Sequence, residues 1–106
     1  MRLLELDTVD ESLASQVPER IMESIEQFVW YGRPTGGFLG AVFCNDLFGA
    51  IGRADHESLA SIGTICKYIY NAVPSVCYGK ESKVAAHIER GRKRIEAMEN
   101  GTIPTN

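Results

Sequence analysis

The sequence predicts an all-α protein, a compact bundle of about four helices with a central glycine-rich helix. In four segments the apolar residues recur three and four positions apart, which is the period of one face of an α-helix. Proline, glycine and asparagine divide these segments into short pieces joined by turns. A chain of 106 residues can bury one hydrophobic core and hardly two. We therefore expect residues 1–106 to form a single helical domain.

The first helix is predicted from Pro18 to about Tyr31. Proline suits the start of a helix because its missing N–H would have no intrahelical acceptor there, and Gly32 is a natural stop. Residues 1–17 are predicted to be a less ordered anchor. Within them the leucines suit a short strand or an irregular segment, and residues 12–16 suit a helical turn. The leucines are Leu3, Leu4 and Leu6, and the apolar stripe of the helix is Ile21, Ile25, Phe28 and Val29.

The central helix is predicted between Thr35, its expected N-cap, and a break at residues 53–55. Gly40, Gly49 and Gly52 lie inside it, and each interior glycine costs about 0.5–1 kcal/mol relative to alanine. We expect close approach to another helix, a partner or a ligand to offset that cost. A groove of small residues at four-residue spacing would make the contact: Gly36, Gly40 and Cys44, with Gly37 and Ala41 beside them. The apolar residues are too many for a narrow stripe, so the helix should be buried on more than one side: Leu39, Val42, Phe43, Leu47, Phe48 and Ile51.

Two further helices complete the prediction. Asp55 should cap the third, which should end before Pro74 because the residue preceding a proline is pushed out of the helical region. The fourth should begin near Ser82 and end near Asn100, followed by a less ordered tail at 101–106. In its second half the apolar stripe is sparse. We therefore expect that half to project from the core or to pack on another subunit.

Charge is unevenly distributed along this chain of formal net charge −3. Residues 1–32 contain seven acidic residues and two arginines, a net charge of −5, so the remainder carries +2. Residues 80–94 hold six basic and two acidic side chains. The acidic front and the basic back can pair within one chain, pair between copies, or leave a basic surface free for an anion. The alternative is a solvated helix face. General nucleic-acid binding is not expected of an acidic protein.

The cysteines and the hydropathy pattern indicate a cytoplasmic protein. Cys44, Cys66 and Cys77 have no CxxC spacing, and reduced, buried thiols are expected. No apolar run approaches the length of a membrane-spanning helix, and the start of the chain is too acidic for a signal peptide. We expect no membrane association.

A candidate ligand-binding site lies at the start of the central helix. Thr35, Gly36 and Gly37 would present free backbone N–H groups to an anion, with Arg33 just before them. Neither GxGxxG nor GxxxxGK[ST] is present, so a flexible glycine turn before a packed helix is the alternative. Aromatic residues near loops could stack on a base while basic residues contact phosphate. Those assigned to the site are Tyr31, Tyr70 and Tyr78, together with Arg53.

No catalytic residue, metal ligand or cofactor is expected. His56 and His87 lack the spacing of a familiar metal site and suit exposed or capping positions. No serine or cysteine has the context of an activated nucleophile. Asp46 and Arg53 are expected to form a structural ion pair or a capping network. The sequence therefore predicts a non-enzymatic protein.

Three runs carry a family resemblance: GGFLGAVFCNDLFGAIGRADHESL, ICKYIYNAVPSVCYG and SKVAAHIERG. Together they resemble a family of small phage and prophage proteins with no established activity. The resemblance covers roughly residues 18–90, and the basic extension after Arg90 departs from the family's pattern. It implies a phage accessory protein in the cytoplasm of the host cell.

Two functions are expected from these observations. The first is a homo-oligomeric protein that sequesters a nucleotide-derived immune signal for a phage. The second is an interaction module that inhibits or regulates a host protein through the acidic first helix or the basic last helix. A weaker third is a DNA-associated adaptor that uses the last helix. Copies would associate through the small-residue groove of the central helix or by pairing acidic fronts with basic backs.

Overall fold

The computed structural model describes residues 11–99, which form six α-helices and one short 3₁₀-helix. The predicted all-α class is confirmed for this part of the chain. The number of helices differs from the prediction because the central helix is divided and a short helix precedes the first one. The leucines of the predicted anchor and the predicted tail lie outside the described residues. The elements are α1 (Glu11–Ser15), α2 (Glu19–Tyr31), α3 (Gly37–Phe43), α4 (Leu47–Arg53), α5 (His56–Ala72), η1 (Ser75–Cys77) and α6 (Glu81–Glu99).

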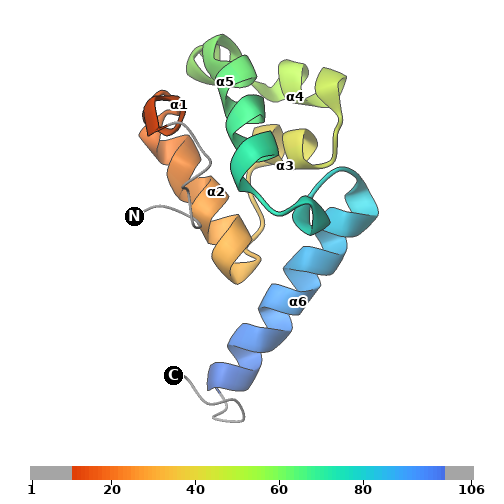
Figure 1. Cartoon of the computed structure of the whole chain (residues 1–106). Helices are drawn as coiled ribbons and strands as arrows, with labels where there is room; N and C mark the ends of the chain where they lie inside the picture. The colour runs from red at the N-terminus through yellow and green to blue at the C-terminus, as the bar shows by residue number, and fades with distance from the viewer. Residues whose placement is uncertain (1–10, 100–106) are drawn as a thin grey trace.

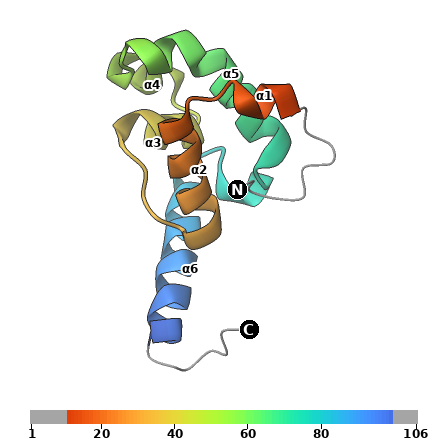
Figure 2. The ribbon, with the colours of Figure 1, turned by 90° about the vertical axis from the view of Figure 1, so that its left-hand side faces the viewer.

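The helices surround a core between α2, α3 and α5. In Figure 1, α5 runs in front of α3, and α2 lies to their left. In Figure 2, which is turned by a right angle, α3 and α5 lie on opposite sides of α2. α6 leaves this group from below, and its last turns extend beyond the other helices in both views. Among the described residues, no helix is both long and apolar enough to span a membrane.

α2 follows its sequence signals closely. Pro18 is its N-cap residue, so the helix begins at Glu19, one position after the predicted start, and Gly32 ends it in the left-handed region with φ +69°. The Gly32 N–H donates to the Phe28 carbonyl at 2.8 Å, and the Arg33 N–H donates to the Gln27 carbonyl at 3.4 Å. This pair of bonds satisfies carbonyls that the helix end would otherwise leave without a donor.

Two phenylalanines anchor the core. Phe28 of α2 and Phe43 of α3 are fully buried and stack with ring centroids 4.3 Å apart. A separation in this range is favourable for aromatic pairs and adds to the benefit of removing both rings from water. Around them pack the buried apolar side chains of four helices, among them Ile21, Ile25, Leu39, Ile65, Tyr68, Ile69 and Val84.

The predicted single central helix is wrong, because the chain breaks it between Phe43 and Leu47. Asn45 takes φ +65°, a left-handed conformation that asparagine tolerates better than most residues. Asp46 then caps a new helix by accepting a hydrogen bond from the Gly49 N–H at 3.0 Å. The break lets α3 and α4 fold back on each other as a helical hairpin.

The predicted burial of this segment holds for α3 and fails for α4. Phe38, Leu39, Ala41 and Phe43 of α3 are buried, whereas Ala50 is the buried residue of α4. On α4, Leu47 is 62% exposed, Phe48 is 87% exposed, and Ile51 is also exposed. The apolar surplus that suggested a doubly buried helix is therefore partly surface.

Of the reasons expected for the central glycines, close approach of another helix is not seen at most positions within residues 11–99. A Cβ added at Gly36 or Gly52 would meet no atom within 4 Å, and one at Gly40 would meet only the Thr35 hydroxyl, at 3.7 Å. In the part of the chain that the structure describes, no helix backbone closes on these three glycines, although the Arg53 side chain of α4 lies against Gly37 in the predicted small-residue groove. At Gly49, the Asp46 carboxylate that caps α4 occupies the position of a Cβ, so this glycine makes room for the cap. The predicted capping role of Asp46 is confirmed, while Arg53 donates to the Gly49 carbonyl at 3.2 Å.

α5 begins and ends as predicted. The Asp55 carboxylate accepts from the Ser58 N–H at 2.8 Å, and this bond, followed by one from the Ser58 hydroxyl, lowers the pKa of Asp55. Arg20 of α2 binds the same cap, with its Nη2 2.7 Å from Asp55 and its Nε 3.0 Å from Glu57. α2 is thereby tied to the start of α5. One arginine of the acidic front thus has its partners on α5.

α6 crosses the end of α2 through two glycines. A Cβ on Gly91 would overlap the Tyr31 carbonyl oxygen and lie 2.7 Å from the Gly32 Cα. The crossing is close enough that only glycine fits on the α6 side. Its neighbours on α6 also bind α2: His87 Nε2 lies 2.7 Å from the Phe28 carbonyl, and an Arg94 Nη2 donates to the Trp30 carbonyl at 2.7 Å. The predicted projection of α6 is therefore partial, because its middle packs on α2.

Candidate functional site

The predicted ligand-binding residues fall into three separate places rather than one. Thr35, Gly36, Gly37 and Arg53 line a common groove. Tyr31 and Arg33 lie around the end of α2 against α6, and the remaining two tyrosines lie at the end of α5 and after η1. The structure therefore assembles half of the predicted site, and the other half of the residues is divided between two surfaces.

The groove at Thr35 is open and has a volume of about 540 Å³. Arg53 crosses its wall, since its Cδ would lie 2.9 Å from a Cβ on Gly37. The carboxylates of Asp46 and Glu81 line the same groove. One arginine facing two carboxylates gives a mixed field that favours a zwitterionic or small polar ligand over a multiply charged anion.

The Arg33 guanidinium has two contacts with side chains at the end of α2. Its Nη1 donates to the Gln27 side-chain oxygen at 2.6 Å. Its guanidinium also lies over the Tyr31 ring, 5.1 Å from the ring centroid, which is within the range of a cation–π contact. Both predicted residues thus contribute to a local structure that closes α2, next to an apolar groove of about 360 Å³ lined by Ile88 and Ile95 of α6.

Tyr70 and Tyr78 differ in environment. Tyr70 is 77% exposed on α5, and Tyr78 is half-buried. Burial raises the pKa of Tyr78, and the neighbouring Tyr70 and Cys77 contribute in the same direction. The two side chains are neighbours but do not line the groove at Thr35.

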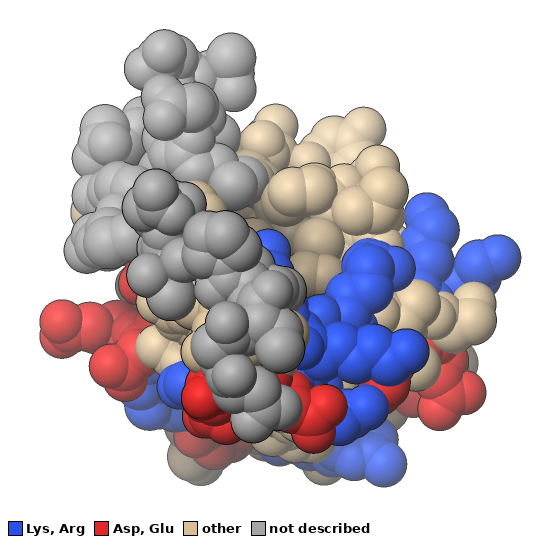
Figure 3. All heavy atoms as spheres, turned by 90° about the horizontal axis from the view of Figure 1, so that it is seen from below, with Lys and Arg blue, Asp and Glu red and all other residues tan. Residues whose placement is uncertain are grey.

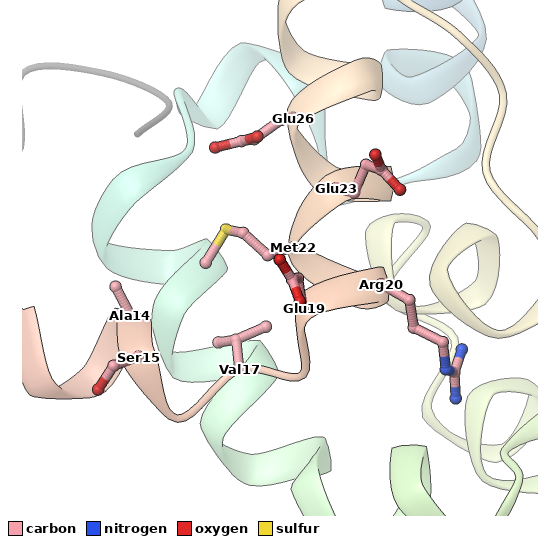
Figure 4. Close-up of a pocket in the computed structure, with 8 residues that line it drawn as sticks. All are labelled: Ala14, Ser15, Val17, Glu19, Arg20, Met22, Glu23 and Glu26. Atoms are coloured by element: carbon pink, nitrogen blue, oxygen red, sulfur yellow. The ribbon is translucent and has the colours of Figure 1, made fainter. Parts of the chain in front are cut away.

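A larger groove, of about 720 Å³, lies where α1 meets α2. Glu19, Glu23 and Glu26 of α2 line it together with Met22 and Val17, and Figure 4 shows the Glu26 side chain to the left of α2 and the Glu23 side chain to its right. Within the described residues, Oε2 of Glu26 is buried and has no hydrogen-bond partner. The unequal charge of the first third of the sequence indicated this acidic surface, but the groove itself depends on how α1 packs against α5 beside the start of α2.

The basic residues of α6 are divided between internal contacts and solvent. Arg92 pairs with Glu89 at 2.7 Å and with Glu96 at 3.6 Å, and Lys93 lies 3.9 Å from Glu89. Figure 3, seen from below, shows most lysines and arginines on the right half of that end of the molecule, with acids among them. The predicted alternative of a solvated helix face with its own ion pairs describes much of this surface.

The three thiols occupy different environments, and the expected burial holds fully for one. Cys77 is buried, Cys44 is half-buried and Cys66 is exposed. Cys77 Sγ lies 3.6 Å from His87 Nδ1, a pairing that no residue spacing indicated. Burial raises the pKa of Cys77, so the thiol form is favoured, and a nucleophilic thiolate is not. Because His87 Nε2 must carry a proton to donate to the Phe28 carbonyl, this histidine acts as a cap for α2.

The most distinctive surface is an apolar one that sequence reasoning assigned to the core. We call it the α4 face, and it consists of Leu47, Phe48 and Ile51. A phenylalanine that is 87% exposed leaves most of its ring in water, where burial against a partner would be favourable by roughly 25 cal/mol per Å². Clustered exposed apolar residues mark binding surfaces more often than single ones do.

Within residues 11–99, no group of three His, Cys, Asp or Glu side chains is placed to hold a metal ion. No protein-family model, no curated protein and no solved structure matches this chain.

Proposed function

We propose that this protein acts by binding a partner protein through the α4 face, without catalysis. The single observation that supports the proposal most is the exposure of Phe48 beside Leu47 and Ile51 on one side of a helix. Aromatic side chains at the centre of an apolar patch commonly supply most of the binding energy of an interface. If the phage resemblance holds, the partner is a host protein that the module inhibits or regulates.

The contacts that hold α4 in place support this role. The helix is short, but Asp46 caps its start, the Arg53 side chain at its end donates to the Gly49 carbonyl, and Ala50 on its inner side is buried. The three apolar side chains therefore project from a backbone that is fixed before binding. A pre-organised surface loses less conformational entropy on association than a flexible one.

Phe48→Ala will strongly reduce capture of the partner. Immobilised wild-type protein and Phe48→Ala protein are exposed to the same bacterial lysate, and the retained proteins are compared by quantitative mass spectrometry. We expect a partner whose recovery falls at least tenfold with Phe48→Ala, corresponding to a loss of about 1.4 kcal/mol or more.

The control is Val76→Ala, which removes a second exposed apolar side chain on η1, where Val76 is 62% exposed. This variant should retain the partner at the wild-type level. Equal recovery with wild-type and Phe48→Ala bait would contradict the proposed role of the α4 face.

A second candidate function is sequestration of a nucleotide-derived signal in the groove at Thr35. The observation in its favour is that Thr35, Gly36, Gly37 and Arg53 line one groove, although the carboxylates of Asp46 and Glu81 in the same groove oppose a multiply charged ligand. Cyclic oligonucleotides and ADP-ribose derivatives are the probes, measured by calorimetry against wild-type protein and Arg53→Ala. This function predicts heat of binding with the wild type and at least about tenfold weaker binding with Arg53→Ala. The absence of binding to every probe would remove it.

A further inference from the structure

The outward side of α5 carries an apolar line that the core does not use. We call it the α5 seam, and it consists of Leu59, Gly63, Cys66 and Tyr70. Leu59 is 46% exposed and Tyr70 is 77% exposed, and the two residues between them are also exposed. Spacings of four, three and four residues place all of them along one strip of the helix surface. The opposite face of α5 packs into the core through Ile65, Tyr68, Ile69 and Ala72.

This strip is unusually free of charge for a helix surface. Among the exposed positions from Leu59 to Asn71, Lys67 is the one charged side chain. Glu57, at the start of the helix, is held by Arg20. A water-facing helix normally carries charged and polar residues opposite its apolar face, and α5 instead has a second apolar face.

Within the described residues, neither a close contact nor the backbone conformation requires a glycine at position 63. A Cβ at this position would meet no atom within 4 Å, and its φ is not in the left-handed region. An interior helical glycine costs about 1 kcal/mol relative to alanine. A small residue in the middle of an apolar seam does have a use when another helix approaches there, because it lets the two backbones come close.

The order of side-chain sizes along the seam makes it complementary to itself. Large residues, Leu59 and Tyr70, stand at its ends, and small ones, Gly63 and Cys66, stand at its centre. If two copies of α5 cross antiparallel about a two-fold axis between the small residues, Leu59 of each copy meets Tyr70 of the other, and Gly63 of each meets Cys66 of the other. Such an isologous contact closes as a dimer and leaves no repeated surface for further growth.

We infer that a second copy of this chain covers the α5 seam in a weak, antiparallel two-fold dimer. The inference goes beyond the proposed function, because the α4 face is a different helix and remains available to another protein. Standard stable interfaces use about 20–30 residues on each side, and one face of a 17-residue helix offers far fewer. The dimer should therefore be reversible and should form at micromolar or higher protein concentrations.

Sedimentation velocity of the full chain over a range of concentrations tests this interface. The sedimentation coefficient of the wild type should rise toward that of a dimer as concentration increases. Gly63→Gln should raise the dissociation constant at least about tenfold, because its side chain occupies the point of closest approach. The matched control is Gly52→Gln, since Gly52 is also an interior helical glycine with open space around it and should leave dimerisation unchanged.

Two further readouts complete the test. Because the α5 seam has no charged residue and Lys67 is the one charged side chain among the exposed positions beside it, added salt should not dissociate the dimer, whereas pairing of acidic fronts with basic backs would weaken. Circular dichroism checks that Gly63→Gln is folded, and Tyr70→Ser provides a second seam variant at a highly exposed position. A wild type that stays monomeric at all concentrations, or seam variants that dimerise as the wild type does, would overturn the inference.

Discussion

Replacing Phe28 with alanine will lower the free energy of unfolding by about 3–5 kcal/mol. The ring is fully buried, and its centroid lies 4.3 Å from that of the stacked Phe43 ring and 4.7 Å from that of the His87 ring, which is inclined to it in a T-shaped pair. Its removal leaves a cavity between α2, α3 and α6 that the surrounding backbone cannot fill. Because domains are typically stable by only about 5–15 kcal/mol, this loss is a large fraction of the total. Chemical denaturation followed by circular dichroism measures it.

The matched control uses the same substitution at an exposed position. Phe48→Ala removes an equal volume from a ring that is 87% exposed, so the free energy of unfolding should change by no more than about 0.5 kcal/mol. The pair separates the core from the binding surface. A large destabilisation by Phe48→Ala would show that α4 is packed in solution and would contradict its assignment as an open face.

Gly91→Ala will destabilise the protein by about 1–3 kcal/mol, although alanine is the better helix former. The new methyl group would collide with the Tyr31 carbonyl and approach the Gly32 Cα to 2.7 Å. α6 must then move away from α2, which stretches the His87 and Arg94 bonds to the end of α2. Thermal unfolding should show a lower midpoint for this variant.

Gly52→Ala makes the same chemical change as Gly91→Ala but should change the free energy of unfolding in the opposite direction. Its Cβ meets no atom within 4 Å, so the gain in helix propensity should stabilise the protein by up to about 1 kcal/mol. If both glycine variants were stabilised equally, α6 would not cross α2 as closely as described.

Local signals were sufficient to predict α2 and α5. Pro18 and Gly32 bracket the first, and Asp55 and Pro74 bracket the second. Each of these boundary signals acts on its own backbone or on neighbours within one turn, so the sequence alone carries the information.

The break between α3 and α4 had a local signal that the apolar pattern concealed. Asn45 and Asp46 are typical of a turn followed by a helix cap, but apolar residues continue on both sides at helical spacing. A pattern of this kind records which residues avoid water and does not distinguish a core from a binding face. Phe48 was therefore assigned to the interior.

Contacts between distant segments lay beyond prediction from the sequence. Gly91 lies in the part of α6 where the apolar stripe is sparse. The need for a glycine there comes from its contact with Tyr31 and Gly32, which are distant in the sequence. The same holds for the candidate site, because Thr35 and Arg53 share a groove only after the chain reverses at Asn45. Tyr31 and Arg33 are within four residues of Thr35 in the sequence. They nevertheless lie at the end of α2, where it contacts α6, and not in the groove at Thr35.

Hydrogen–deuterium exchange with and without the captured partner tests the proposed binding face most directly. The proposal predicts that bound partner slows exchange in α4, residues 47–53, and that Phe48→Ala prevents the slowing at the same partner concentration. Protection confined to the acidic groove of α1 and α2, or to α6, with α4 exchanging as in the free protein, would contradict it.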